Sequence, residues 1–113
     1  MLELRGYVDK KGSKPFASWL ESLDASAAAK VTMGLTRIEL GEFSNVKSVG
    51  SGVYEHKIDF GPGYRIYFGK DGDKLVILLG GGTKKRQNRD IQDAQASWMD
   101  YKRRKKQEAH QCR

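Results

Sequence analysis

The segment "VYEHKIDFGPGYRIYF", residues 53–68, predicts a β-hairpin and decides the fold. Aromatic or aliphatic residues alternate with more polar ones on both sides of "GPG", residues 61–63. Proline fixes one backbone dihedral and glycine tolerates a positive one, so this triplet suits a reversal of the chain. Because side chains of a strand alternate between the two faces of a sheet, one face is predicted to be core and the other to carry charge.

Arg65 is predicted to lie on the charged face, together with Glu55, Lys57, Asp59 and Tyr67. An arginine held by a rigid sheet suits bidentate binding of a phosphate. The same position also suits a cross-strand ion pair with Glu55 or Asp59, as on ordinary exposed sheet faces. On the pattern alone, the ion pair is the simpler interpretation.

His56 has the opposite parity and points to the same side as Ile58 and Phe60. The alternation therefore predicts a structural role for this histidine rather than a catalytic one.

Downstream of the hairpin, "LVILL" at residues 75–79 is an uninterrupted apolar run, typical of a central strand covered on both faces. The glycines at 80–82 are predicted to end this strand. A helix should follow, because apolar residues recur there at helical spacing; they are Ile91, Ala94, Trp98 and Tyr101. Residues 84–86 then lie in a glycine-rich turn that can offer N–H groups to an anion, although the spacing is not that of a P-loop.

The amino-terminal part predicts one short strand and two helices. "LELRGYV", residues 2–8, has apolar residues of one parity, and "PFASWLESL", residues 15–23, has an amphipathic helical stripe that begins at a proline. Asp24 is expected to cap a second helix, and Gly41 to follow its end.

Length and composition fit a single domain, placed at residues 1–101 and followed by a basic, flexible tail at 102–113. No apolar run approaches the roughly 18 to 20 residues of a membrane span, and the first ten residues lack a signal-peptide stretch. We therefore expect a cytoplasmic protein that does not bind membranes. Cys112 is the only cysteine, so an internal disulfide or a cysteine metal cluster is excluded.

The net charge of +7 is concentrated at the carboxy terminus. Residues 84–113 carry ten Lys or Arg against four Asp or Glu, whereas residues 1–83 carry eleven against ten. Clustered cations favour a polyanionic partner, most often nucleic acid, because they displace counterions from phosphates. A solvated helix end with a frayed tail is the alternative for residues 101–113.

Three segments in this order resemble the RelE/ParE superfamily of toxins from toxin–antitoxin systems: "PFASWLESL", "GVYEHKIDFGPGYRIYF" and "LVILLGGGTKKRQNRDIQDA". The likeness extends from about residue 15 to residue 100 and is strongest to phage-derived addiction-module killer proteins of the HigB-like branch. It implies an α+β domain in which two amino-terminal helices pack on a mainly antiparallel, twisted sheet of about four strands, with a carboxy-terminal helix and a basic concave face.

The resemblance also implies a function. Many members are endoribonucleases that cut mRNA in the ribosomal A site, and each is silenced by an antitoxin, in this branch usually a small helix-turn-helix protein. Contacts with 16S rRNA are expected as well. ParE members instead poison DNA gyrase without cleaving anything themselves, and an RNA-binding accessory protein without toxicity is a third possibility. The fold alone does not choose among them.

RNA cleavage by internal attack needs a base for the 2′-hydroxyl and positive charge for the phosphorane, and it requires no metal or cofactor. We predict that Arg65, Lys57 and Lys84 stabilise this charge and that Lys57 or Glu55 acts as the base. Some related toxins use a histidine or a late tyrosine as the acid, where this sequence offers only Tyr101. The residues predicted to contact RNA are Tyr67, Lys85, Arg86, Gln87, Asp90, Lys102, Arg103 and Arg104.

Overall fold

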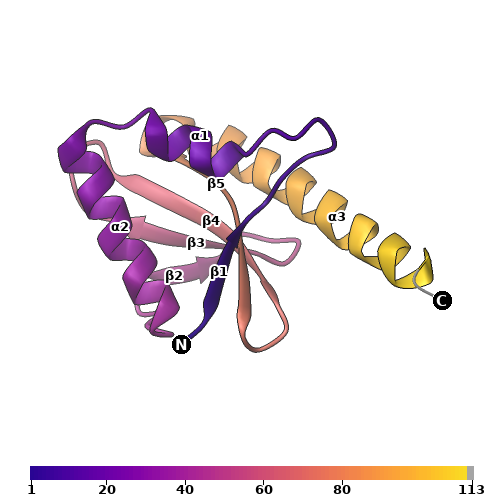
Figure 1. Cartoon of the computed structure of the whole chain (residues 1–113). Helices are drawn as coiled ribbons and strands as arrows, with labels where there is room; N and C mark the ends of the chain where they lie inside the picture. The colour runs from indigo at the N-terminus through magenta and orange to yellow at the C-terminus, as the bar shows by residue number, and fades with distance from the viewer. Residues whose placement is uncertain (112–113) are drawn as a thin grey trace.

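A computed structural model describes the backbone of residues 1–111, and Cys112 and Arg113 lie outside the described part (Figure 1). The elements in chain order are β1 (Glu3–Gly6), α1 (Pro15–Glu21), α2 (Ala25–Glu39), β2 (Val46–Ser48), β3 (Val53–Ile58), β4 (Tyr64–Asp71), β5 (Leu75–Thr83), a 3-10 turn (Lys84–Arg86) and α3 (Gln87–Gln111).

The strands form one mixed sheet in the order β1-β5-β4-β3-β2. The pair β1 and β5 is parallel, and the other three pairs are antiparallel. The α+β prediction and the hairpin are confirmed, but the sheet has five strands rather than about four. The strand that the sequence did not predict is β2, whose three residues are too few to show an alternation.

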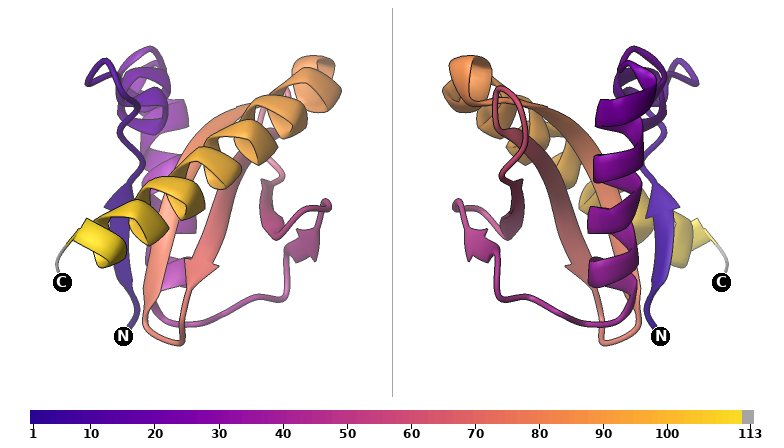
Figure 2. Two further views of the ribbon diagram at one scale, coloured as in Figure 1. Left: turned by 90° about the vertical axis from the view of Figure 1, so that its right-hand side faces the viewer. Right: turned by 90° about the vertical axis from the view of Figure 1, so that its left-hand side faces the viewer.

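Helices cover both faces of the sheet (Figure 2). Phe16 of α1 and Val31 of α2 pack with Ile66 and Phe68 on one face. On the other face, Trp98 of α3 packs with Tyr67 among a second set of buried side chains. The apolar run of β5 is therefore buried from both sides, as predicted.

The prediction of an open, charged face beside Arg65 is wrong. Glu55, Arg65 and Tyr67 are all buried. The physical reason is the apolar stripe of α3, which must be removed from water. Because α1 and α2 already occupy the opposite face, α3 packs on the face that carries Arg65. At the Arg65 end, the face remains open to solvent beyond the first turn of α3.

The glycines at 80–82 do not end the strand, contrary to prediction, because β5 continues to Thr83. Two of them allow side chains to lie directly on the sheet. A Cβ built on Gly81 would be 2.3 Å from ring atoms of Trp19, and one on Gly82 would be 1.9 Å from Oδ2 of Asp90. Gly81 and Gly82 therefore serve close packing of α1 and α3 on β5 rather than an anion-binding turn.

The caps of α2 confirm the prediction from sequence. The Asp24 carboxylate accepts a hydrogen bond from the backbone N–H of Ala27 at 2.8 Å. Gly41 has a φ of +74°, which is the conformation expected just after a helix.

Helix α3 is 25 residues long and includes residue 101, after which the sequence predicted a basic, flexible tail. Two side chains in its second half contact the end of β4. Tyr101 donates a hydrogen bond to Asp71 at 2.6 Å, and the Lys105 ammonium lies 2.5 Å from the same carboxylate. Within the described part of the chain, the helices have no stretch long and apolar enough to cross a bilayer.

Candidate functional site

A cavity of about 300 Å³ opens at the end of the sheet face that α3 leaves uncovered. We call it the Arg65 cavity. Its polar lining residues are Ser44, Asn45, Lys47, Glu55, Lys57, Asp59, Arg65 and Gln87. These come from β2 and the loop before it, from β3 and β4, and from the first turn of α3, so four separate segments converge on one site.

Arg65 lines this cavity, and its side chain is only 5% exposed. Two contacts hold the side chain in place. Its Nη1 donates a hydrogen bond to the carbonyl oxygen of Gly63 at 2.7 Å, and its Nε lies 3.8 Å from Oε1 of Glu55. Nε is buried and has no hydrogen-bond partner among the described residues. The contacts with Gly63 and Glu55 thus preorient the guanidinium of a side chain that lines the cavity.

Glu55 lies beside Arg65 and is buried as well, with 1% of its surface exposed. Its Oε2 accepts a hydrogen bond from the Gln87 amide at 2.8 Å, and its Oε1 lies 3.8 Å from the Lys47 ammonium. The predicted ion pair of Arg65 is therefore present, with Glu55 as the partner rather than Asp59. Removing one member of such a buried pair typically costs about 3–5 kcal/mol, because the other charge is left without compensation.

Lys57 is directly opposite Arg65 in the pairing of β3 with β4. Its side chain is about half exposed and lies 3.4 Å from Asp59. The structure therefore brings Lys57 and Arg65 together, as the sequence predicted.

Lys84 adjoins this site without lining it. Its backbone N–H donates to the Gly63 carbonyl at 3.1 Å, so Lys84 and Arg65 share one acceptor. Its side chain is exposed. Lys85 and Arg86 are also exposed, in the same 3-10 turn, and do not line the cavity.

Tyr67 does not fit the predicted contact with RNA, because it is completely buried beneath α3. Burial raises the pKa of its hydroxyl above the usual value, and the neighbouring carboxylates of Glu55 and Asp90 add to this. Tyr67 is therefore a core residue whose hydroxyl stays protonated.

Of the two α3 residues expected to contact RNA near its start, only Gln87 reaches the cavity. Asp90, one helical turn later, packs on Gly82 and does not line the cavity, and burial raises the pKa of its carboxyl.

The residues Lys102, Arg103 and Arg104 lie far from this site. Lys102 is fifteen residues after Gln87 in one helix, which corresponds to roughly 22 Å along the axis. Arg103 and Arg104 form ion pairs with Asp100 at 2.9 and 3.0 Å. Any contact that this end of α3 makes with RNA would be separate from the Arg65 cavity.

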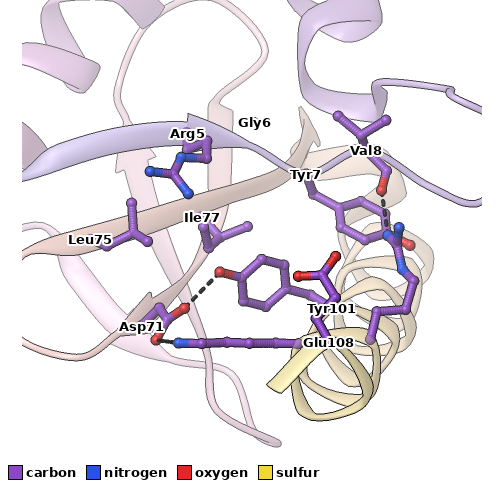
Figure 3. Close-up of a pocket in the computed structure, with 11 residues that line it drawn as sticks. Arg5, Gly6, Tyr7, Val8, Asp71, Leu75, Ile77, Tyr101 and Glu108 are labelled. Atoms are coloured by element: carbon purple, nitrogen blue, oxygen red, sulfur yellow. Dashed lines mark hydrogen bonds and ion pairs between the residues drawn. The ribbon is translucent and has the colours of Figure 1, made fainter. Parts of the chain in front are cut away.

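A cavity of about 470 Å³ lies at this far end, between α3 and the edge of the sheet (Figure 3). Several of its polar groups are engaged with each other or with the backbone. Tyr101 and Lys105 bind Asp71, and Arg104 donates to the carbonyl oxygen of Val8. Burial and the bond to Asp71 raise the pKa of Tyr101 to about 12, which does not suit a general acid at neutral pH.

Four residues of the Arg65 cavity were missed from the sequence: Ser44, Asn45, Val46 and Lys47. Val46 and Lys47 belong to β2, and no periodic signal marks that short strand. In the part of the chain that the structure describes, no group of three or more His, Cys, Asp or Glu side chains is placed to hold a metal ion.

Comparison with known proteins places the chain in a family. Residues 18–98 match the family described as "Phage derived protein Gp49-like (DUF891)". The chain belongs to the Gp49-like family. This family is of the RelE/Gp49 toxin type, which is consistent with a toxin of a toxin–antitoxin module.

An uncharacterized protein of Haemophilus influenzae is similar to this Gp49-like chain. The two are 42% identical over 88 residues, which cover 77% of this chain and 89% of the relative. The matched family segment includes every residue that lines the Arg65 cavity.

Proposed function

We propose that this Gp49-like protein is the toxin of a type II toxin–antitoxin module and that it cleaves mRNA on the ribosome, with the scissile phosphate in the Arg65 cavity. The observation that carries the proposal is the guanidinium of Arg65. It is anchored by the Gly63 carbonyl and by Glu55, and it faces a cavity that it shares with Lys57. A preorganised cation of this kind suits the charge that develops on a phosphorane.

In the proposed reaction, the 2′-oxygen of a ribose attacks the adjacent phosphorus and the bond to the 5′-oxygen breaks. The products are a 2′,3′-cyclic phosphate and a 5′-hydroxyl. The proton of the 2′-hydroxyl passes to a base, and a water molecule donates one to the 5′-oxygen. Arg65 contributes positive charge at the non-bridging oxygens, and Lys57 adds to it once its amine has taken up the proton.

Glu55 and Lys57 were both candidates for the base. Glu55 is buried and engaged by Gln87 and Arg65, so it suits a positioning role. Lys57 has the exposed side chain of the two. We therefore assign the contact with the 2′-hydroxyl to Lys57, and the orientation of Arg65 and Gln87 to Glu55.

The proposal includes a cytoplasmic location, a helix-turn-helix antitoxin as the partner, and contacts with 16S rRNA. The exposed cations of the 3-10 turn and of the second half of α3 suit the last role, because exposed Lys and Arg bind phosphates without reading sequence. Lys84, Lys85, Arg86, Lys102 and Arg103 are the residues concerned.

Induction of the chain in a host without the antitoxin, followed by mapping of transcript ends, tests this function. We expect growth arrest with 2′,3′-cyclic phosphate and 5′-hydroxyl ends, and the loss of both effects in Lys57→Ala. Lys11→Ala, which removes an exposed charge from the loop before α1, is the matched control. Growth arrest with DNA breaks and intact transcripts would instead select a gyrase-directed toxin and overturn the proposal.

A further inference from the structure

A second cavity, of about 280 Å³, lies between α2 and the end of β3, on the opposite side of the sheet from the Arg65 cavity. We call it the α2–β3 cavity. Three cations line it, Lys30 and Arg37 from α2 and Lys57 from β3, against a single carboxylate, Asp59. An excess of positive charge in a concave site favours an anionic ligand.

The floor of this cavity contains a buried histidine without hydrogen bonds. His56 is 1% exposed, and neither ring nitrogen has a hydrogen-bond partner among the described residues. The ring lies against α2 because residue 34 is glycine, where a Cβ would be 3.3 Å from His56 Nε2. A buried polar group without a partner costs about 1–3 kcal/mol, so its retention calls for an explanation such as a ligand.

The charged groups around His56 favour its neutral form in the free protein. Burial and the Arg37 guanidinium lower the pKa of the imidazole, and Glu42 acts weakly in the opposite direction. Lys30, Lys57 and Asp59 line the same cavity. A neutral imidazole offers one N–H donor to a bound anion, and the anion in turn favours protonation of the ring.

The α2–β3 cavity adjoins the Arg65 cavity around the edge of the sheet. Asn45, Lys57 and Asp59 line both. Strand β2 pairs with β3 from Tyr54 to His56, and the Lys57 N–H donates to the Asn45 carbonyl at 3.1 Å just before β2, so this pairing ends at Lys57. A flexible polyanion can follow the exposed Lys57 side chain around the edge of the sheet where the pairing ends.

We propose that the α2–β3 cavity is a second subsite for the RNA strand, in which Lys30 and Arg37 bind the phosphate next to the one at Arg65. Phe60 at the rim is 36% exposed, and the Lys30 ammonium lies 5.3 Å from its ring centroid. An exposed aromatic ring beside phosphate-binding cations is a common platform for stacking an unpaired base. This inference rests on the proposed function, because it takes the ligand of the Arg65 cavity to be RNA.

Binding of a single-stranded DNA pentanucleotide, measured by fluorescence anisotropy at several salt concentrations, tests the subsite. The probe lacks the 2′-hydroxyl and cannot be cleaved by internal attack. The test variant is Lys30→Ala/Arg37→Ala, and the matched control is Lys10→Ala/Lys11→Ala, which removes two exposed charges from a loop elsewhere. Thermal unfolding checks that both variants are folded.

We expect the test variant to bind the probe about tenfold or more weakly and to lower the salt slope by about 0.7, since Lys30 and Arg37 share one phosphate and each phosphate contact on a single strand contributes about 0.7. The control should stay within about twofold of wild type. Equal affinity and equal slope in the two variants would overturn the subsite.

The pKa of His56, one of only two histidines in the chain, provides a second measurement. It distinguishes binding of an RNA-like strand from binding of free phosphate. In NMR titrations, the pentanucleotide should raise the pKa of His56, whereas inorganic phosphate at the same concentration should not. An equal rise with inorganic phosphate would show a simple anion site and overturn the assignment to a strand.

Failure of this inference is distinguishable from failure of the proposed function. If Arg65→Lys loses RNA cleavage while Lys30→Ala/Arg37→Ala binds the probe like wild type, only the subsite is refuted. If the wild-type protein cleaves no RNA but probe binding depends on Lys30, Arg37 and Arg65, only the proposed function is refuted.

Discussion

Replacing Gly81 by alanine should destabilise the fold much more than the same change at its neighbour, Gly80. A Cβ at position 81 would be 2.3 to 2.6 Å from three ring atoms of Trp19. Carbon atoms in contact are normally about 3.5–4.0 Å apart, so the indole would have to move by roughly 1 Å or more. A Cβ at position 80 meets nothing within 4 Å among the described residues.

The expected magnitudes follow from these distances. Overpacking of this kind typically costs about 1–3 kcal/mol. Gly80→Ala should instead stabilise by about 0.4–1 kcal/mol, because it restricts the unfolded chain without a clash. The two variants should therefore differ by about 1.5–4 kcal/mol in the free energy of unfolding, or about 6–16 °C in Tm for a chain of this length.

Chemical and thermal unfolding followed by circular dichroism measure this difference. Trp19→Ala provides the internal check, because Gly81→Ala should add no further destabilisation once the indole is gone. If Gly81→Ala and Gly80→Ala unfold alike in the wild-type background, the glycines do not serve close packing, and the prediction of a glycine-rich turn would have to be reconsidered.

Two further predictions concern pH. Hydrogen bonds from Lys105 and Tyr101 lower the pKa of Asp71, and the bond from Tyr7 lowers that of Asp100. A carboxyl with a lowered pKa in the folded state stabilises the fold above the unfolded value, near 4, and this stability is lost as the pH falls further. Tyr7→Phe should therefore lower the free energy of unfolding by about 1 kcal/mol at pH 7 and reduce the loss of stability on acidification. Urea unfolding between pH 7 and 2.5 measures both effects. An unchanged pH profile would argue against the hydrogen bond between Tyr7 and Asp100. His56 has a lowered pKa because its buried ring resists protonation, so its contribution is complete above about 6.5 and falls as the pH decreases below that value. His56→Leu should flatten the stability profile between pH 7 and 5, and a slope like that of wild type would show that this imidazole does not carry the effect.

The sequence predicted the elements of the fold well because their signals are local. The alternation around "GPG", the apolar run of β5 and the Asp24 cap each depend on neighbouring residues, and each is present in the structure. The layers were predicted less well. The alternation of the hairpin correctly separates two faces, but it does not tell whether a distant helix covers the second one.

The candidate site shows the same difference between features with a local sequence signal and features that depend on long-range packing. Pairing Lys57 with Arg65 follows from the hairpin register, which the sequence contains. Burial of Glu55 and Tyr67 follows from the position of α3, and the presence of Lys47 follows from the pairing of β2 with β3. Both are long-range contacts without a local signal. The glycines at 80–82 were read as a turn because close packing and chain reversal use the same residue type.

The central claim is that Arg65 supplies preorganised charge to a scissile phosphate. The rate of mRNA cleavage on purified ribosomes by Arg65→Lys tests it most directly. Lysine keeps a positive charge beside Glu55 but lacks the forked donors of arginine, and Arg5→Lys, at an exposed position in β1, is the matched control. We expect Arg65→Lys to be slower by about 10²–10³-fold, the typical loss of one preorganised donor, with a cooperative melting curve that shows a folded protein. A rate within a few-fold of wild type would contradict the role of Arg65.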